Sequence, residues 1–98
     1  MNYTHIFYAQ KAEQDILSIV EYIAKDNYKK AIEYRNGIVD TIEKLLIFPL
    51  GGKKYDNEFR RLKFKRHYIF YHLNETNKSI QIHHVRHDRQ LPYKPYKP

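Results

Sequence analysis

The chain has 98 residues, of which 42% are hydrophobic and 15% aromatic, and its formal net charge is +7. These values exclude a disordered chain and predict a single domain at residues 1–92, followed by a short Pro/Tyr/Lys tail at 93–98. With no cysteine, the chain has neither a disulfide framework nor a thiol nucleophile. No apolar run resembles a signal peptide or approaches the roughly 20 residues of a membrane span, so we expect a cytoplasmic protein without membrane contact.

The hydrophobic pattern predicts one strand, then two helices, then three strands. A segment rich in β-formers opens the chain, and two apolar stripes at helical spacing follow it. A near-continuous apolar segment then lies between two other strand-like segments, which is typical of an antiparallel meander with a central strand. In chain order the elements are expected at 3–8, 12–23, 31–46, 59–64, 67–73 and 79–87.

Individual residues predict where the two helices end and where the last strand is irregular. Asp26-Asn27 is expected to stop the first helix, because asparagine tolerates the left-handed C-cap conformation, and Pro49 with Gly51-Gly52 ends the second. Ile80 and Ile82 share one face of the last strand, but regular alternation would place Val85 on the other face. This predicts either a bulge near His83-His84 or a sheet that is partly covered on both faces there. The expected fold is α+β, in the order β-α-α-β-β-β, with a helical hairpin packed on one face of a mainly antiparallel sheet.

The end of the last predicted strand is rich in imidazole and guanidinium groups. Imidazole can move protons near neutral pH, and guanidinium can hold phosphate and offset charge in phosphoryl transfer. The alternative is a solvated strand end whose side chains face water or pair with Asp88. Zinc is disfavoured, because neither cysteine nor a helical His-x-x-x-His pair completes a ligand set, and no cofactor is expected. The residues concerned are His83, His84, Arg86, His87 and Arg89.

A second basic group lies within and on both sides of the first strand of the meander. The net charge of +7 favours polyanions or acidic proteins as partners. Basic side chains with aromatic ones between them suit phosphate contacts and base stacking, whereas the alternative is an edge strand that charge protects from aggregation. The group comprises Lys53, Lys54, Arg60, Arg61, Lys63, Lys65 and Arg66, with Tyr55, Phe59 and Tyr68 among them.

A set of motifs over about residues 5–93 resembles the RelE/ParE toxin superfamily of type II toxin–antitoxin modules. The family's fold is the β-α-α-β-β-β arrangement expected above. Each motif is short, but their order and spacing together are specific. They are A-x-x-D-I-L-x-I-V-x-Y-I at 12–23, A at 31, I-x-x-x-I-x-x-L-x-x-x-P at 38–49, G-G at 51–52, R-x-L at 60–62, Y-x-I-F-Y (as HYIFY, 67–71) and V-x-H-x-R at 85–89.

The resemblance implies a cognate antitoxin protein that wraps the toxin and supplies negative charge. One branch of the superfamily cleaves messenger RNA on translating ribosomes without metal, and the ParE-like branch inhibits DNA gyrase. The helix pair, the G-G after Pro49 and the run through V-x-H-x-R are more similar to the ParE-like branch, so gyrase inhibition is the favoured function. An mRNA endoribonuclease and a non-toxic relative that still binds antitoxin are the alternatives.

The resemblance also implies roles for individual residues. In an endoribonuclease, His87 would act as acid or base, and Arg61 and Arg89 would stabilise the pentavalent phosphate. Tyr93 would stack on a base or assist proton transfer. Tyr68 is a departure from the endoribonuclease branch, which often has arginine at this position. Contacts with the target or with nucleic acid are expected from Lys53, Lys54, Arg60, Lys65, Arg66 and Arg86.

Overall fold

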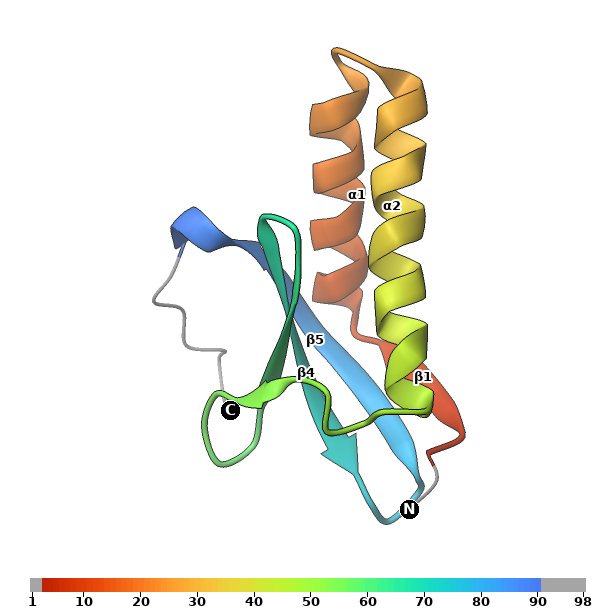
Figure 1. Cartoon of the computed structure of the whole chain (residues 1–98), viewed down its shortest axis with the longest axis vertical. Helices are drawn as coiled ribbons and strands as arrows, with labels where there is room; N and C mark the ends of the chain where they lie inside the picture. The colour runs from red at the N-terminus through yellow and green to blue at the C-terminus, as the bar shows by residue number, and fades with distance from the viewer. Residues whose placement is uncertain (1–2, 91–98) are drawn as a thin grey trace.

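A five-stranded sheet forms one layer of the protein (Figure 1). The computed structural model describes residues 3–90, and its strands lie in the order β1-β5-β4-β3-β2. β1 runs parallel to β5, and every other neighbouring pair is antiparallel. This confirms the predicted α+β class, whereas the two-residue β2 was not expected. The strands are β1 (His5–Tyr8), β2 (Lys53–Lys54), β3 (Arg60–Phe64), β4 (His67–Asn74) and β5 (Ser79–His87).

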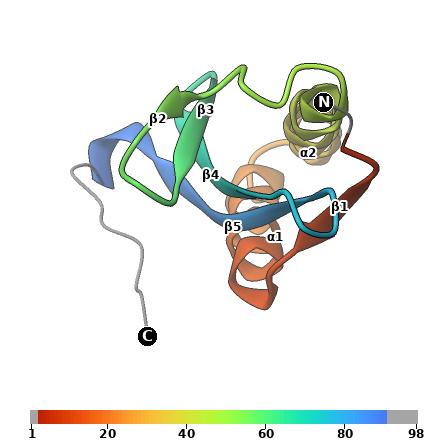
Figure 2. The ribbon, with the colours of Figure 1, turned by 90° about the horizontal axis from the view of Figure 1, so that it is seen from below.

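Two helices form the second layer. α1 (Gln10–Ala24) and α2 (Tyr28–Glu43) lie side by side on one face of the sheet, and their far half projects beyond it (Figures 1 and 2). Short 3-10 turns follow α2 as η1 (Lys44–Leu46) and β5 as η2 (Asp88–Gln90). Among residues 3–90, neither helix has the length and apolar character that crossing a membrane requires. The core between the layers includes Ile38, Ile42, Ile69, Tyr71, Ile80, Ile82 and Val85.

The link between the helices differs from the prediction. Asn27 is not a left-handed C-cap of α1, since its φ of −158° and ψ of 105° are extended. Its side chain instead accepts a hydrogen bond of 3.0 Å from the Lys30 backbone N–H and so caps the start of α2. The prediction was wrong because asparagine suits both helix ends, and the side-chain acceptor satisfies an N–H that the first turn of α2 leaves unpaired.

Replacing this cap should weaken the hairpin measurably. We expect Asn27→Ala to lower the free energy of unfolding by about 1 kcal/mol, because the first turn of α2 loses a side-chain acceptor. Urea denaturation followed by circular dichroism measures the change. Asn36→Ala is the matched control, because Asn36 is exposed within α2 and alanine is the better helix former. Equal destabilisation by both variants would contradict the capping role.

The predicted irregularity in β5 is confirmed as a bulge at His83. Tyr71 of β4 pairs with Ile82, and the adjacent Phe70 pairs with His84, so His83 is the extra residue. Because side chains alternate between faces along a strand, the extra residue reverses the alternation that follows it. Val85 therefore joins Ile82 in the core between sheet and helices.

The loop before β2 is fixed where the backbone of Gly52 lies against the Tyr71 side chain. A Cβ atom on Gly52 would lie 2.6 Å from the Arg61 carbonyl oxygen and 2.8 Å from the Tyr71 hydroxyl, so only glycine fits. The buried Tyr71 hydroxyl accepts a hydrogen bond of 2.9 Å from the Gly52 N–H and donates one of 2.8 Å to the Pro49 carbonyl. One side chain of β4 thus anchors the whole turn that leads into β2.

Candidate functional site

The sheet separates the predicted site residues between its two faces. Residues paired across strands share a face, and alternate residues along a strand change face. Leu62, Ile69 and Val85 pair in one row and belong to the core beneath the helices. The row of Phe64, His67 and His87 therefore lies on this helix face, at the strand ends. The rows of Arg61 with Phe70 and of Lys63, Tyr68 and Arg86 lie on the opposite face, here called the open face.

The structure thus does not gather the predicted catalytic set into one centre. Arg61 lies on the open face, whereas His87 lies on the helix face, because the bulge at His83 reversed the alternation of β5. Arg89 follows His87 in η2, and its N–H donates a hydrogen bond of 3.0 Å to His87 Nδ1. Tyr93 lies outside the described residues.

A polar cluster occupies the helix face at the strand ends. The ring of buried His67 lies 5.1 Å from that of His87, and His67 Nδ1 shares a hydrogen bond of 2.6 Å with the Tyr34 hydroxyl of α2. Burial, helped by the neighbouring His87 and opposed by Asp88, lowers the pKa of His67 to about 4. His67 is therefore neutral at neutral pH and acts as a structural hydrogen-bonding group.

Asp88 forms an ion pair with Arg66 beside this cluster. Its Oδ2 atom lies 3.2 Å from Arg66 Nε, and its Oδ1 atom lies 3.0 Å from His87 Nδ1. Next to the cluster, a groove of about 580 Å³ runs along α1 and combines apolar with basic lining. Such a surface suits a protein contact better than a phosphoryl-transfer site, because one of its guanidinium groups is already paired. The groove is lined mainly by Ile19, Tyr22, Ile23, Tyr34, His87 and Arg89.

The open face carries a second cluster of a different kind. The Arg61 guanidinium carbon lies 4.7 Å from the ring centre of Tyr68 and 5.6 Å from that of Tyr55. Lys63 Nζ lies 5.4 Å from the Tyr68 ring, and Lys53 is paired with Arg61 across β2 and β3. A pocket of about 370 Å³ opens among these side chains. We call Lys53, Tyr55, Arg61, Lys63 and Tyr68 the open-face cluster.

The remaining predicted contact residues have separate surroundings. Lys54 is exposed on β2 opposite Arg60, whose Nη1 donates a hydrogen bond of 2.8 Å to the Gly52 carbonyl. Arg60 therefore supports the loop anchored by Tyr71. Lys65 and Arg66 form the exposed two-residue turn between β3 and β4, in which Lys65 takes a φ of 51°. Half-buried Arg86 pairs with Tyr68 on the open face.

A buried aspartate, which the sequence did not single out as a site residue, supports β5 where β1 has ended. The β1–β5 pairing stops at Tyr8 and Ile82, so within residues 3–90 the later part of β5 has no neighbouring strand on that side. Asp15 of α1 takes the place of the strand, because its Oδ2 atom accepts a hydrogen bond of 3.1 Å from the Val85 N–H. Lys11 Nζ lies 3.0 Å from the other oxygen.

Removing that carboxylate should destabilise the protein. We expect Asp15→Ala to cost about 1.5–3 kcal/mol of unfolding free energy, because a charge-assisted hydrogen bond is lost and a buried N–H is left unpaired. Chemical denaturation measures the loss. Lys11→Ala is the control, since it removes only the half-exposed partner and should cost at most about 1 kcal/mol. A neutral Asp15→Ala variant would contradict the anchoring role.

Tyr34 could not be recognised as a site residue from the sequence, because a tyrosine within an apolar helical stripe is indistinguishable from an ordinary core residue. Tyr55 appeared only as one aromatic among basic residues, and its place beside Arg61 depends on the loop conformation. Within residues 3–90, no three His, Asp or Glu side chains converge in a way that could hold a metal ion.

The family comparison places this helical hairpin and sheet among the toxins of type II toxin–antitoxin systems. The family model described as the ParE toxin of the type II toxin–antitoxin system parDE matches residues 6–92. The match spans most of the sequence, so the chain belongs to the ParE toxin family. The resemblance to the RelE/ParE superfamily, with the ParE-like branch favoured, is thereby confirmed.

Solved structures share the fold at low sequence identity. The chromosomal ParDE system from P. aeruginosa aligns with a TM-score of 0.73 and 19% identity, over 86% of this chain and 95% of that one. The toxin–antitoxin complex RelBE2 from Mycobacterium tuberculosis aligns with a TM-score of 0.58 and 18% identity, over 89% of this chain and 99% of that one. No curated protein matches the sequence.

Proposed function

We propose that this toxin arrests growth by inhibiting DNA gyrase in the cytoplasm through surface contacts, without catalysing a reaction. The observation that supports this proposal is the position of Arg61 and His87 on opposite faces of the sheet. Acid–base cleavage of RNA needs the proton-transfer group and the charge-stabilising group within reach of one phosphate. Two groups separated by a sheet cannot meet that requirement in this conformation.

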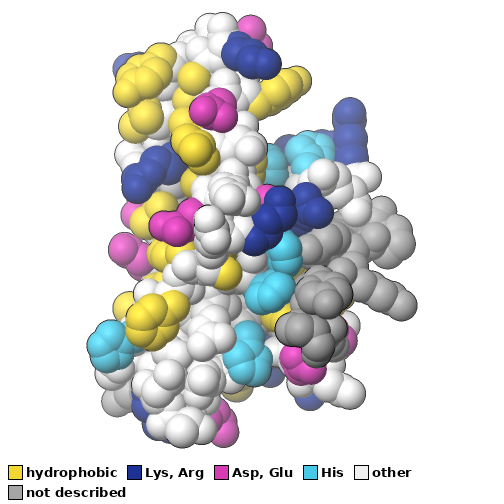
Figure 3. Space-filling model, turned by 180° about the vertical axis from the view of Figure 1, so that it is seen from behind, with side chains coloured by type: hydrophobic (Ala, Val, Ile, Leu, Met, Phe, Trp, Pro, Cys, Tyr) yellow, Lys and Arg dark blue, Asp and Glu magenta, His cyan; other side chains and the backbone are white. Residues whose placement is uncertain are grey.

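The proposed neutralising partner is a cognate antitoxin that binds the helical hairpin. Hydrophobic side chains are exposed along the hairpin among acidic and basic ones (Figure 3), including Leu17 and Tyr22 with exposed fractions of 57% and 74%. A groove of about 450 Å³ between the helices is lined by Ile16, Leu17 and Val20 of α1 and Val39 of α2, and by Arg35 together with the carboxylates Glu13 and Glu43. The apolar side of an amphipathic segment fits such a groove, and the net charge of +7 would attract an antitoxin that is acidic as a whole.

The second candidate is a ribosome-dependent mRNA endoribonuclease. The grouping of His87 with Arg66 and Arg89 beside one groove favours it, because an imidazole and guanidinium groups could act together on a phosphate there. In this alternative, Arg61 would contact RNA outside the reacting centre.

Two assays with purified toxin separate the candidates. A gyrase supercoiling assay is expected to show inhibition that the antitoxin relieves. A cell-free translation reaction without added gyrase is expected to leave mRNA 5′ ends and protein synthesis unchanged. Cleavage that occurs only on translating ribosomes would overturn the proposal, and activity in neither assay would identify a non-toxic antitoxin-binding relative.

His87→Ala provides a sharper distinction between the same candidates. If gyrase inhibition operates through surface contacts, His87→Ala should change it only as much as a single contact does, by less than about tenfold. An endoribonuclease that uses this imidazole for proton transfer would instead lose roughly 10²–10⁴-fold in cleavage rate. The unfolding midpoint of the variant controls for loss of structure.

A further inference from the structure

We propose that the open-face cluster is a binding site for single-stranded nucleic acid, with phosphates held by Lys53, Arg61 and Lys63 and a base stacked at Tyr68. This activity is separate from gyrase inhibition and from RNA cleavage, and it does not rest on either. It would give the toxin a nucleic-acid ligand in addition to its protein partners.

The charge of the cluster is uncompensated. Three cationic side chains line one pocket of about 370 Å³, together with Gly51, Leu62 and Tyr68. Among residues 3–90, no carboxylate lies within ion-pair distance of any of the three cations. At the strand ends, by contrast, Asp88 already pairs with Arg66. An anion at the open-face cluster would therefore meet cations that need not first break an ion pair with a carboxylate.

The guanidinium of the cluster is held in place before any ligand binds. Arg61 lies between the rings of Tyr55 and Tyr68, at 5.6 and 4.7 Å, and Tyr55 itself packs edge-on against buried Phe70 at 5.0 Å between ring centres. Cation–π contacts of this kind restrict the long arginine side chain, which lowers the entropy lost on binding phosphate.

The spacing and shape of the cluster favour an extended strand. Arg61 and Lys63 are two residues apart on β3, which corresponds to roughly 6.8 Å along the strand. This is comparable to the separation of neighbouring phosphates in an extended nucleic-acid chain. Half-buried Tyr68 lies beside both cations, so a base between two such phosphates could stack on its ring or on the guanidinium plane.

The lining also predicts little sequence preference. Among the described residues, the lining includes no Asp, Glu, Asn or Gln side chain that would distinguish the hydrogen-bonding edge of one base from another. Lysine and arginine contacts to phosphate, with stacking on an aromatic ring, accept any base.

The test uses the full-length toxin and a fluorescein-labelled thymidine oligodeoxynucleotide of about ten nucleotides, a length within the range of single-strand sites. DNA lacks the 2′-hydroxyl, so metal-free RNA cleavage cannot affect the readout. Fluorescence anisotropy at about 50 to 200 mM salt gives the affinity and its salt dependence. The triple variant K53Q/R61Q/K63Q should bind the oligonucleotide more weakly. The magnitude of its slope of log affinity against log salt should be smaller by about 2, because each of the three lost phosphate contacts contributes about 0.7.

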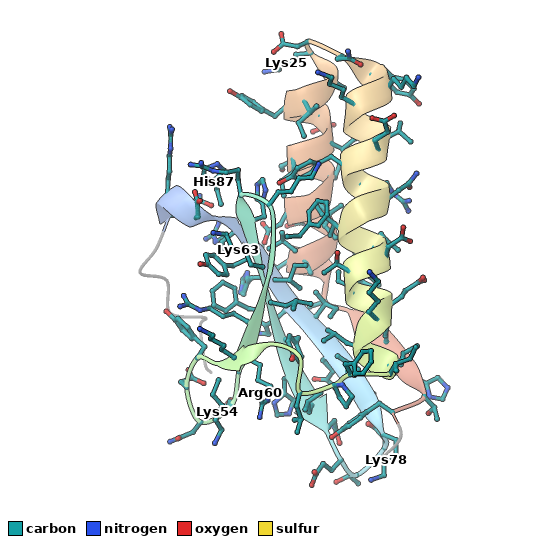
Figure 4. All side chains as sticks on the ribbon, viewed as in Figure 1. Lys25, Lys54, Arg60, Lys63, Lys78 and His87 are labelled. Carbon is teal, nitrogen blue, oxygen red and sulfur yellow. The ribbon has the colours of Figure 1, made fainter. Side chains whose placement is uncertain are left out.

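A matched control removes the same charge elsewhere. K25Q/K29Q/K30Q takes three exposed lysines from the tip of the hairpin, where Figure 4 shows Lys25 far from Lys63 and Lys54. This control should change the slope little. Equal effects of the two triple variants would overturn the proposal, because the binding would then depend on net charge alone. Should the site triple variant not fold, the exposed single variants Lys53→Gln and Lys63→Gln should each lower the slope by about 0.7.

Stacking distinguishes nucleic acid from an acidic protein as the ligand. Tyr68→Ala should weaken oligonucleotide binding by about 5- to 150-fold, and Tyr68→Phe should preserve it. Polyglutamate has negative charge but no bases, so it should compete poorly at equal charge. An unchanged affinity in Tyr68→Ala, or competition by polyglutamate as effective as by unlabelled oligonucleotide, would overturn the proposal.

Discussion

Lowering the pH from about 6.5 to about 4 should destabilise the folded toxin steeply. Burial lowers the pKa of both His67 and His84 from 6.5 to about 4. In this window the unfolded chain binds protons that the folded chain excludes, so the stability falls as pH decreases. For each histidine, the free energy of unfolding falls by up to about 1.4 kcal/mol per pH unit. Over the whole window this amounts to a loss of stability on the order of 2–3 kcal/mol per histidine.

The surroundings of the two histidines reinforce this effect. After burial, the next causes are His87 for His67 and His83 for His84, because each neighbouring imidazole disfavours a second positive charge. Asp88 and Asp15 oppose these shifts but are outweighed by burial.

Urea denaturation at several pH values between 7 and 4.5 measures the effect. The range from 6.5 to 5 is diagnostic, because ordinary carboxylates bind few protons above pH 5. His67→Gln should remove its share of the slope and keep a polar side chain beside Tyr34. A free energy of unfolding that stays constant over this range would show that the histidines bind protons in the fold as readily as in the unfolded chain.

The second large effect is expected from Tyr71→Phe, which removes one oxygen atom and should cost about 2–4 kcal/mol of unfolding free energy. The lost hydroxyl leaves both the Gly52 N–H and the Pro49 carbonyl without their partner, and an unsatisfied buried group costs about 1–3 kcal/mol. The loop before β2 should also loosen, so its amide hydrogens should exchange faster with solvent.

Tyr68→Phe is the control on the same strand. Among residues 3–90 its hydroxyl makes no hydrogen bond, so the change should stay within about 0.5 kcal/mol. Guanidinium denaturation and hydrogen exchange measure both variants. If Tyr71→Phe proved as stable as Tyr68→Phe, water would have replaced the missing hydroxyl and the loop would not depend on it.

Much of the fold could be predicted because its elements have strong periodic signals. The two helical stripes and the alternation of β3 each repeat over several residues, and the displaced phase of Val85 marked the bulge in β5. β2 escaped detection because two residues cannot establish a period. Asn27 was predicted to end the first helix but instead caps the start of α2, because asparagine suits both the N-terminal and the C-terminal end of a helix.

The separation of Arg61 from His87 could not be predicted, since it depends on register. The two-residue turn at Lys65-Arg66 sets the pairing of β3 with β4, and the bulge at His83 sets that of β4 with the end of β5. If β5 continued to alternate regularly after Ile82, without a bulge, His87 would lie on the same face as Arg61. The bulge thus decides which of the basic groups can act together.

The order of the strands has a consequence for the newly made polypeptide. β5 pairs with both β1 and β4, yet it is synthesised after all the other strands and both helices. Until it emerges, β1 has no strand to pair with, and the apolar side of the hairpin lacks Ile80, Ile82 and Val85. Contacts so distant along the chain form late in folding. A nascent chain interrupted before residue 79 should therefore be unfolded and harmless to the cell that makes it.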